Sequence, residues 1–207
     1  MAGNEIQAPI FEFTGNRLCL DFVNTIHDRA GTPRELLHSY DDLIAWSLEG
    51  DILTEAEAEQ LRKKADQQKA EAAAVLRQAI DLRETIYRIC FAIATDVSPA
   101  EVDLSAFNDM LAKAMAHAYL QHAEDSFVWD WRDKGQALDR MLWPVVRSTA
   151  DVLSSEDRDS VRVCAAEDCS WMFLDTSKNH SRRWCDMKSC GNRAKVRKHY
   201  SQKKQSA

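Results

Sequence analysis

The segment CAAEDCSWMFLDTSKNHSRRWCDMKSCGNRAK, residues 164–195, decides how the last quarter of this chain folds. It carries four cysteines in the spacing C-x4-C-x15-C-x4-C: Cys164, Cys169, Cys185 and Cys190. Residues five apart lie about 140° apart around a helix, so each pair must sit on a turn rather than on one helix face. Two such turns can close a tetrahedral tetrathiolate around one metal ion. The spacing therefore predicts a single structural Zn²⁺.

Other uses of these cysteines fit the spacing less well. A plant-type ferredoxin needs C-x4-C-x2-C, whereas the middle gap here is fifteen residues. A redox pair needs C-x-x-C, which the chain lacks. The alternative that remains is a set of unrelated buried thiols.

We expect no enzyme. A zinc ion saturated by four thiolates has no open position for water, so its role should be structural. The chain also lacks the common nucleotide-binding, hydrolase and metalloprotease motifs, namely G-x-x-x-x-G-K-[ST], G-x-G-x-x-G, G-x-S-x-G and H-E-x-x-H.

The charge of the chain is divided unevenly. Residues 178–207 carry ten Lys or Arg and a single acid, Asp186, which gives +9. The other 177 residues carry 17 basic and 32 acidic side chains, which gives −15. Such asymmetry indicates a basic module attached to an acidic body. DNA would attract the module and repel the body.

The basic residues around the cysteines have two interpretations. Zinc with four thiolates carries a net charge of −2, so some nearby cations could serve only to offset it: Arg182, Arg183, Lys188 and Arg193. A helix over residues 192–202 would instead present cations on two sides, suited to phosphates and base edges in a major groove. The candidate nucleic-acid contacts are Arg182, Arg183, Arg193, Lys195, Arg197 and Lys198.

The region before the cysteines is predicted to be mainly helical. Capping patterns begin two helices, one over residues 40–49 and one from residue 55 to about 95. Forty unbroken helical residues would span about 60 Å, so we expect a break near residues 67–70.

Further elements follow in both directions. Helical spacing continues over residues 103–117 and again from Gly135 to about residue 152, where Pro144 must kink the helix or start a new segment. Residues 119–132 predict a hairpin. Residues 10–27 fit either strands or one to two helical turns.

The predicted fold class is thus mainly α. A helical domain with a small β element spans residues 1–155, and a four-cysteine zinc-finger module ending in a basic helix spans residues 160–207. The N-terminus lacks the features of a signal peptide, and no apolar run approaches the roughly 20 residues of a membrane span. We therefore expect a cytoplasmic protein with no membrane association, and Cys19 and Cys90 as reduced core thiols.

The cysteine-containing segment, residues 164–195, resembles the CGNR zinc-finger family of bacterial proteins. The family is named for the tetrapeptide found here at Cys190–Arg193. Upstream, LCLDFVNT at residues 18–25 and YDDLIAW at residues 40–46 resemble the ABATE domain that precedes this finger in the family. The resemblance covers nearly the whole chain. It implies a mostly helical N-terminal domain and a stress-induced transcription regulator that binds DNA.

The N-terminal motif of that family falls on Asp21, Asn24 and Thr25. Polar groups in such an apolar run need hydrogen-bond partners if they are buried. They could form a buried cap or turn network. Alternatively, they could line a pocket for a small effector, together with Arg17 and the aromatic pair Trp129 and Trp131.

We therefore expect a DNA-binding regulator whose N-terminal domain senses an effector or mediates association. A homodimer would supply two half-sites. One alternative is a zinc-stapled protein-interaction or dimerisation module, with its basic surface docked on the acidic body. Another is an RNA-binding module, because phosphate attraction does not distinguish between duplex types.

Overall fold

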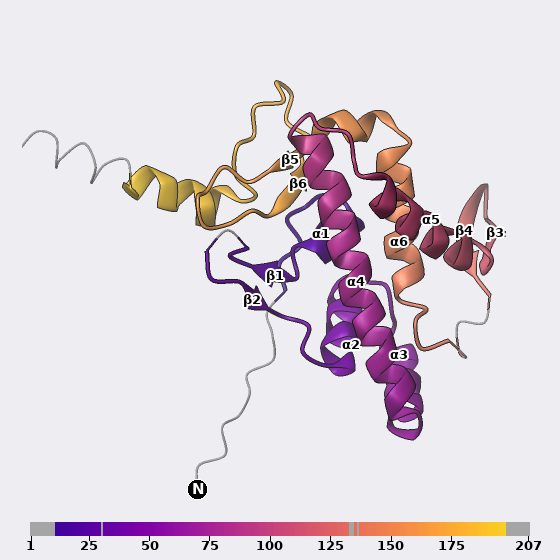
Figure 1. The fold of residues 1–207 in the computed structure, drawn as a ribbon. Helices are drawn as coiled ribbons and strands as arrows, with labels where there is room; N and C mark the ends of the chain where they lie inside the picture. The colour runs from indigo at the N-terminus through magenta and orange to yellow at the C-terminus, as the bar shows by residue number, and fades with distance from the viewer. Residues whose placement is uncertain (1–10, 30, 133–134, 136, 198–207) are drawn as a thin grey trace, which may run out of the picture.

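The computed structural model describes residues 11–29, 31–132, 135 and 137–197. Helices dominate it, which confirms the mainly α prediction (Figure 1). The long helix α4, Lys69–Ala94, runs through the middle of the molecule and contacts most of the others. Five further labelled α-helices precede the C-terminal segment: α1 (Leu18–Val23), α2 (Tyr40–Glu49), α3 (Glu55–Gln67), α5 (Glu101–Met115) and α6 (Leu142–Leu153).

Both predicted capping boxes form. At the start of α2, the Ser39 hydroxyl accepts from the Asp42 backbone N–H, and the Asp42 carboxylate accepts from the Ser39 N–H. Thr54 and Glu57 repeat this exchange at α3. The expected break between helices also occurs, since only Gln68 separates α3 from α4.

The hairpin is confirmed as β3 (Ala118–Ala123) paired antiparallel with β4 (Ser126–Trp131). One other expectation needs correction, and two open alternatives are decided. The helix predicted from Gly135 begins only at Leu142, so Pro144 lies in the first turn of a new segment, where no N–H partner is needed. For residues 10–27, the helical alternative is confirmed: within the described part, residues 11–27, lie the helix α1 and one short strand, β1 (Ile26–His27).

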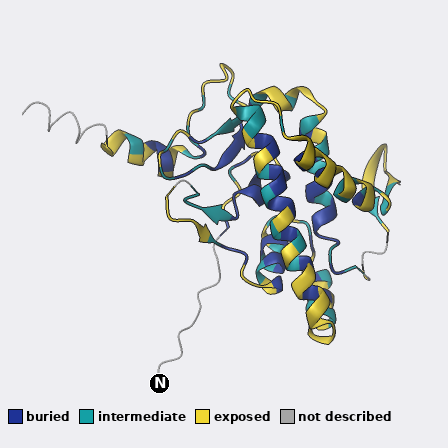
Figure 2. Cartoon of the chain, in the orientation of Figure 1, coloured by how far each residue is buried: buried dark blue, intermediate teal, exposed yellow. Residues whose placement is uncertain are grey.

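One apolar core extends from the helices into the C-terminal segment (Figure 2). That segment opens with a 3-10 turn, η1 (Glu156–Ser160), followed by the antiparallel pair β5 (Val161–Val163) and β6 (Met172–Leu174). Val161, Met172 and Leu174 belong to the same cluster as the side chains of α1 and α4, whereas Phe173 packs on the other side with the four cysteines. Cys19 and Cys90 also lie in this core, and burial raises the pKa of Cys19 to about 11.

A polar seam reinforces this packing along β6. The Asn24 side-chain amide donates to the Met172 carbonyl and accepts from the Met172 N–H, both at 2.9 Å. Further along, the Leu174 N–H donates to the Gly15 carbonyl at 2.8 Å, and Asn16 donates to the Leu174 carbonyl at 3.0 Å. The segment before and after α1 therefore covers one edge of the C-terminal sheet.

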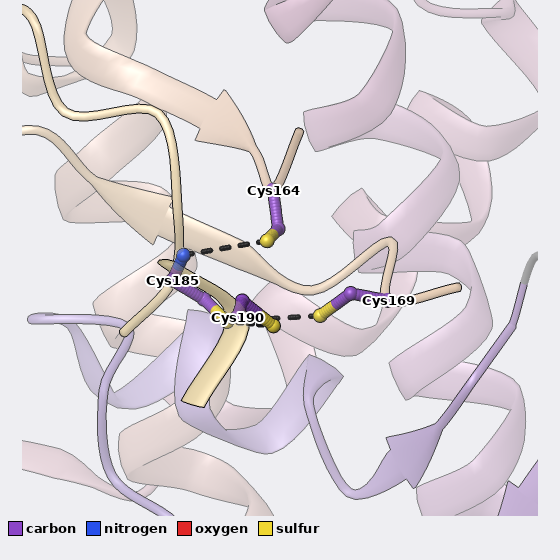
Figure 3. Close-up of side chains that lie close together, drawn as sticks. All are labelled: Cys164, Cys169, Cys185 and Cys190. Atoms are coloured by element: carbon purple, nitrogen blue, oxygen red, sulfur yellow. Dashed lines mark hydrogen bonds between the residues drawn. The ribbon is translucent and has the colours of Figure 1, made fainter. Parts of the chain in front are cut away.

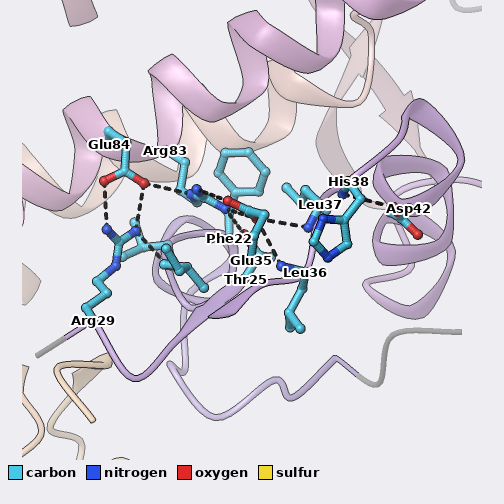
Figure 4. A network of polar contacts seen from close by, with 12 residues as sticks. Phe22, Thr25, Arg29, Glu35, Leu36, Leu37, His38, Asp42, Arg83 and Glu84 are labelled. Carbon is cyan, nitrogen blue, oxygen red and sulfur yellow. Dashed lines mark hydrogen bonds and ion pairs between the residues drawn. The ribbon is translucent and has the colours of Figure 1, made fainter. Parts of the chain in front are cut away.

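A second buried network fixes the ribbon of β1 and β2 (Arg34–Glu35) to α4 (Figure 4). The buried Arg83 guanidinium on α4 makes two bonds to the Glu35 carboxylate, at 2.6 and 2.7 Å. Burial alone would raise the pKa of Glu35, but the hydrogen bonds and charge of Arg83, together with the backbone N–H groups of Leu36 and Leu37, outweigh it and lower that pKa. Beside them, Arg29 pairs with Glu84 at 2.7 Å.

Within the part of the chain that the structure describes, no helix has both the length and the apolarity needed to cross a membrane.

Candidate metal centre

The four cysteines predicted as metal ligands come together (Figure 3). All four are buried and none is in a disulfide, and their sulfur atoms lie within 4.8 Å of one another. The Sγ atoms of Cys169 and Cys190 each lie 3.6 Å from that of Cys185. A tetrahedral zinc site with Zn–S bonds of about 2.3 Å needs sulfurs about 3.8 Å apart. The cluster therefore fits one structural zinc ion.

The first pair of ligands is held by the β5–β6 turn. Cys164 directly follows β5, and its N–H donates to the Trp171 carbonyl at 2.8 Å, which extends the β5–β6 pairing by one more bond. Inside the turn, the Cys169 N–H donates to the Ala166 carbonyl at 3.1 Å. The two thiols thus project from one short loop, as the x4 spacing requires.

The second pair leads into the final helix. Cys190 lies in a single π-helical turn, η2 (Met187–Gly191), which Asp186 caps by accepting from the Ser189 N–H at 2.7 Å. Residues 192–197 continue as an α-helix. The helix therefore starts two residues after a metal ligand.

Two arginines stabilise the metal centre from outside. The Arg193 guanidinium donates to Cys190 Sγ at 3.0 Å, and this bond raises the pKa of Arg193. Arg182 lies over the Phe173 ring and donates to the backbone carbonyls of Thr14 and Cys185. These contacts agree with the interpretation in which some of the cations offset the charge of the thiolates.

The six predicted nucleic-acid contacts have different surroundings. Arg182 is half-buried and makes the contacts just described. Arg183 is exposed, and its guanidinium lies 5.5 Å from the ring of Trp184. The final helix presents Arg193, Lys195 and Arg197 as exposed side chains. Lys198 lies outside the described residues.

The final helix also pairs with two acids that the sequence reasoning missed. Arg197 donates to Asp168 at 2.8 Å and approaches Glu167 at 3.6 Å, and Arg193 lies 3.7 Å from Asp168. Burial would raise the pKa of Asp168, but the bond from Arg197, the backbone N–H of Asp168 and the charges of both arginines together outweigh it and lower that pKa. The sequence offered one signal for this pairing, which is opposite charge. Glu167 and Asp168 lie between the first two cysteines, and the final helix is basic.

Of the candidate pocket residues, Asp21 lies within α1 and Asn24 and Thr25 directly follow it, and all three are buried. The Asp21 carboxylate accepts from the Gly15 N–H at 2.7 Å, and the Thr25 hydroxyl donates to the Phe22 carbonyl at 2.8 Å. Asn24 makes the paired bonds to β6 described above. A buried hydrogen-bond network accounts for these contacts, and the effector pocket stays a prediction.

The residues proposed to accompany that pocket lie elsewhere. Arg17 pairs with Asp157, next to the C-terminal segment. On the hairpin, Trp129 lies under Arg147 at 4.7 Å, and Trp131 packs on Trp143 of α6.

Family comparisons divide the chain where the metal centre begins. The ABATE family, described as "Putative stress-induced transcription regulator", matches residues 16–156. The CGNR zinc finger matches residues 160–203, which include all four cysteines. No curated protein shows significant similarity to the chain. The chain belongs to the ABATE family, and its C-terminal segment is a CGNR zinc finger with a four-cysteine site for one structural zinc ion.

Proposed function

We propose that this protein is a cytoplasmic transcription regulator that binds DNA through the zinc finger. The observation that carries the proposal is the direct connection between the metal centre and the exposed basic helix at residues 192–197. Metal binding supplies folding free energy to a short segment, so the helix would be held in one orientation. Residues 1–155 would then act as the sensing or association unit, and residues 160–207 as the DNA-binding unit.

The contacts favour different roles for the basic residues. Arg183 and Lys195 are exposed and make no ion pair with any residue the structure describes, so we assign them to phosphates. Arg193 and Arg197 are engaged with Asp168, and a phosphate would have to compete with that carboxylate. We assign these two to orienting the helix, and Arg182 to supporting the metal centre.

The test is a binding titration of duplex DNA over a salt series, with zinc content measured on every sample. Each phosphate contact contributes about −0.9 to the slope of log K against log salt, so each lost contact should make that slope shallower by about 0.9. The double variant Arg183→Glu and Lys195→Glu should lose at least about two contacts. Lys113→Glu, on the exposed face of α5, is the matched control and should keep the parent slope.

No binding at low salt, with zinc bound and the fold intact, would overturn the proposal. A double variant that binds with the parent slope would overturn the assignment of Arg183 and Lys195. Competition between matched DNA and RNA duplexes separates a DNA regulator from an RNA-binding module.

One observation favours a second candidate, a protein-interaction or dimerisation module. The final helix already contacts carboxylates, because Arg197 pairs with Asp168 and Glu167 in the turn between Cys164 and Cys169. The same basic surface could dock on acids of a second copy or of another protein. If Arg197→Glu with Lys198→Glu abolishes self-association but leaves DNA binding intact, this second function is supported.

A further inference from the structure

A cleft of about 240 Å³ lies between the β1–β2 ribbon and the zinc finger. One wall consists of Glu12, His27, Asp28 and Arg34, and the other includes Trp171 and Arg193. The two walls therefore come from different ends of the chain (Figure 1). Pockets for drug-sized ligands measure about 300–1,000 Å³, so this one suits a smaller molecule.

The walls are fixed in position. The ribbon is anchored to α4 through the Glu35–Arg83 bonds of Figure 4. It is also joined to the finger, because the Trp171 indole N–H donates to the Ile26 carbonyl at 3.0 Å. The His27 ring meets the Trp171 ring edge-on, with centroids 4.7 Å apart. A preformed cleft loses little conformational entropy when a ligand binds.

The cleft walls carry charges of both signs. Two guanidinium groups, Arg34 and Arg193, line the cleft together with two carboxylates, Glu12 and Asp28. Three of the zinc-binding cysteines also line it, and a zinc tetrathiolate adds a net charge of −2. A ligand with only negative charge would meet the carboxylates and thiolates, and one with only positive charge would meet the arginines. A ligand that carries both charges avoids either repulsion.

The polar groups of the ribbon wall have capacity for a ligand. The Arg34 guanidinium has one hydrogen bond within the described part of the chain, to His27 Nδ1 at 2.9 Å, so most of its five donors remain. Because an arginine can only donate, Nδ1 must be the acceptor and the proton lies on Nε2. That Nε2–H is buried out of a ligand's reach and has no hydrogen-bond partner among the described residues, so the donors that this wall offers a ligand come from Arg34.

We propose that this cleft binds a small zwitterion, a free α-amino acid. Its carboxylate would bind Arg34, and its ammonium would bind Glu12 and Asp28. Its side chain would lie against the Trp171 ring. Each ligand charge then meets a group of opposite charge, and both family segments contribute to the site.

The experiment is calorimetric titration of the zinc-loaded full chain with each of the twenty common amino acids. We expect at least one to bind with a Kd below about 1 mM. For that amino acid, the analogue lacking the amino group and the analogue lacking the carboxylate should each bind at least tenfold more weakly. The proposal is overturned if no amino acid binds, or if either analogue binds as well as the parent compound.

Two variants locate the site. Arg34→Gln should weaken binding at least tenfold, and Glu12→Gln offers an independent test should the first variant fold poorly. Both side chains are exposed, so we expect both variants to fold. Arg77→Gln on α4 is the matched control, because Arg77 is exposed and does not line the cleft. Unchanged affinity in both cleft variants would place the ligand elsewhere and refute the assignment.

A ligand in this cleft would touch Arg193, in the first turn of the final helix. If the finger binds DNA, ligand and DNA would change each other's affinity by the same factor. This consequence rests on the proposed function, whereas the calorimetric test does not. If a ligand binds but leaves the DNA affinity unchanged, that result would contradict the coupling and leave the amino-acid site standing.

Discussion

Replacing Asn24 by alanine should weaken the whole fold, although Asn24 touches no metal ligand. Asn24 is only 3% exposed, and its amide satisfies both backbone groups of Met172, which is fully buried. Without the amide, that N–H and that carbonyl lose their partners where water cannot reach them. Each unsatisfied group costs about 1–3 kcal/mol, so we expect a loss of about 2–6 kcal/mol.

The assay is urea unfolding of the zinc-loaded protein, followed by tryptophan fluorescence. In a protein of this size, 1 kcal/mol corresponds to about 2–4 °C in Tm, so thermal unfolding should shift by at least about 4 °C. The control is Asn108→Ala, on the exposed face of α5, which should stay within about 0.5 kcal/mol of the parent. If Asn24→Ala matches that control, the seam along β6 contributes no stability and the reasoning fails.

Two further perturbations test the metal centre and a buried carboxyl. Cys185→Ser should reduce bound zinc from one ion per chain to nearly none and abolish the near-ultraviolet circular dichroism signal of the finger. The control Cys90→Ala, in the helical core, should keep its zinc. Equal zinc in both variants would contradict the site. Burial raises the pKa of Asp21 from 3.8 to about 6, so the folded state binds this proton more tightly, and stability from this group falls as pH rises from about 4 to about 6. The asparagine in Asp21→Asn can still accept from the Gly15 N–H but does not titrate. As pH rises from about 4 to about 6, the stability of this variant relative to the parent should therefore rise by on the order of 3 kcal/mol. A difference in urea unfolding that stays constant with pH would refute the shift.

Local signals in the sequence predicted most elements correctly. The two capping boxes depend on side chains three residues apart, and the break at Gln68 follows from the length of the apolar stripe. The metal centre was equally accessible, because the spacing within each cysteine pair already requires a turn. In each case the partners are close in sequence, so the geometry of a single turn determines which local structure forms.

The long-range contacts could not be predicted in this way. Asn24 and Met172 are 148 residues apart, and no pattern around either one names the other. Arg83 and Glu35 show the same limit, because an arginine in an apolar helical stripe indicates burial without identifying its partner. The cleft between the ribbon and the finger depends on such pairings, so it became visible only in three dimensions.

Gly191 directly follows the metal ligand Cys190. A glycine at such a place often adopts a positive φ, which other residues rarely do. None of the glycines described has a positive φ. Instead, a Cβ at Gly191 would lie 2.3 Å from the sulfur of Met187. Glycine supplies space for that side chain rather than backbone freedom.

The seam along β6 also has a consequence for the order in which the protein is made. Ribosomes complete the N-terminal helices before β6 emerges, so the groove that Met172 and Leu174 fill stays open until the last part of synthesis. During that interval, the Asn24 amide and the apolar surface around α1 face solvent. A fragment that ends before β5 would keep that exposed surface permanently and should aggregate. The finger thus completes the body that precedes it, and swapping fingers between relatives would require matching residues 14–24 as well.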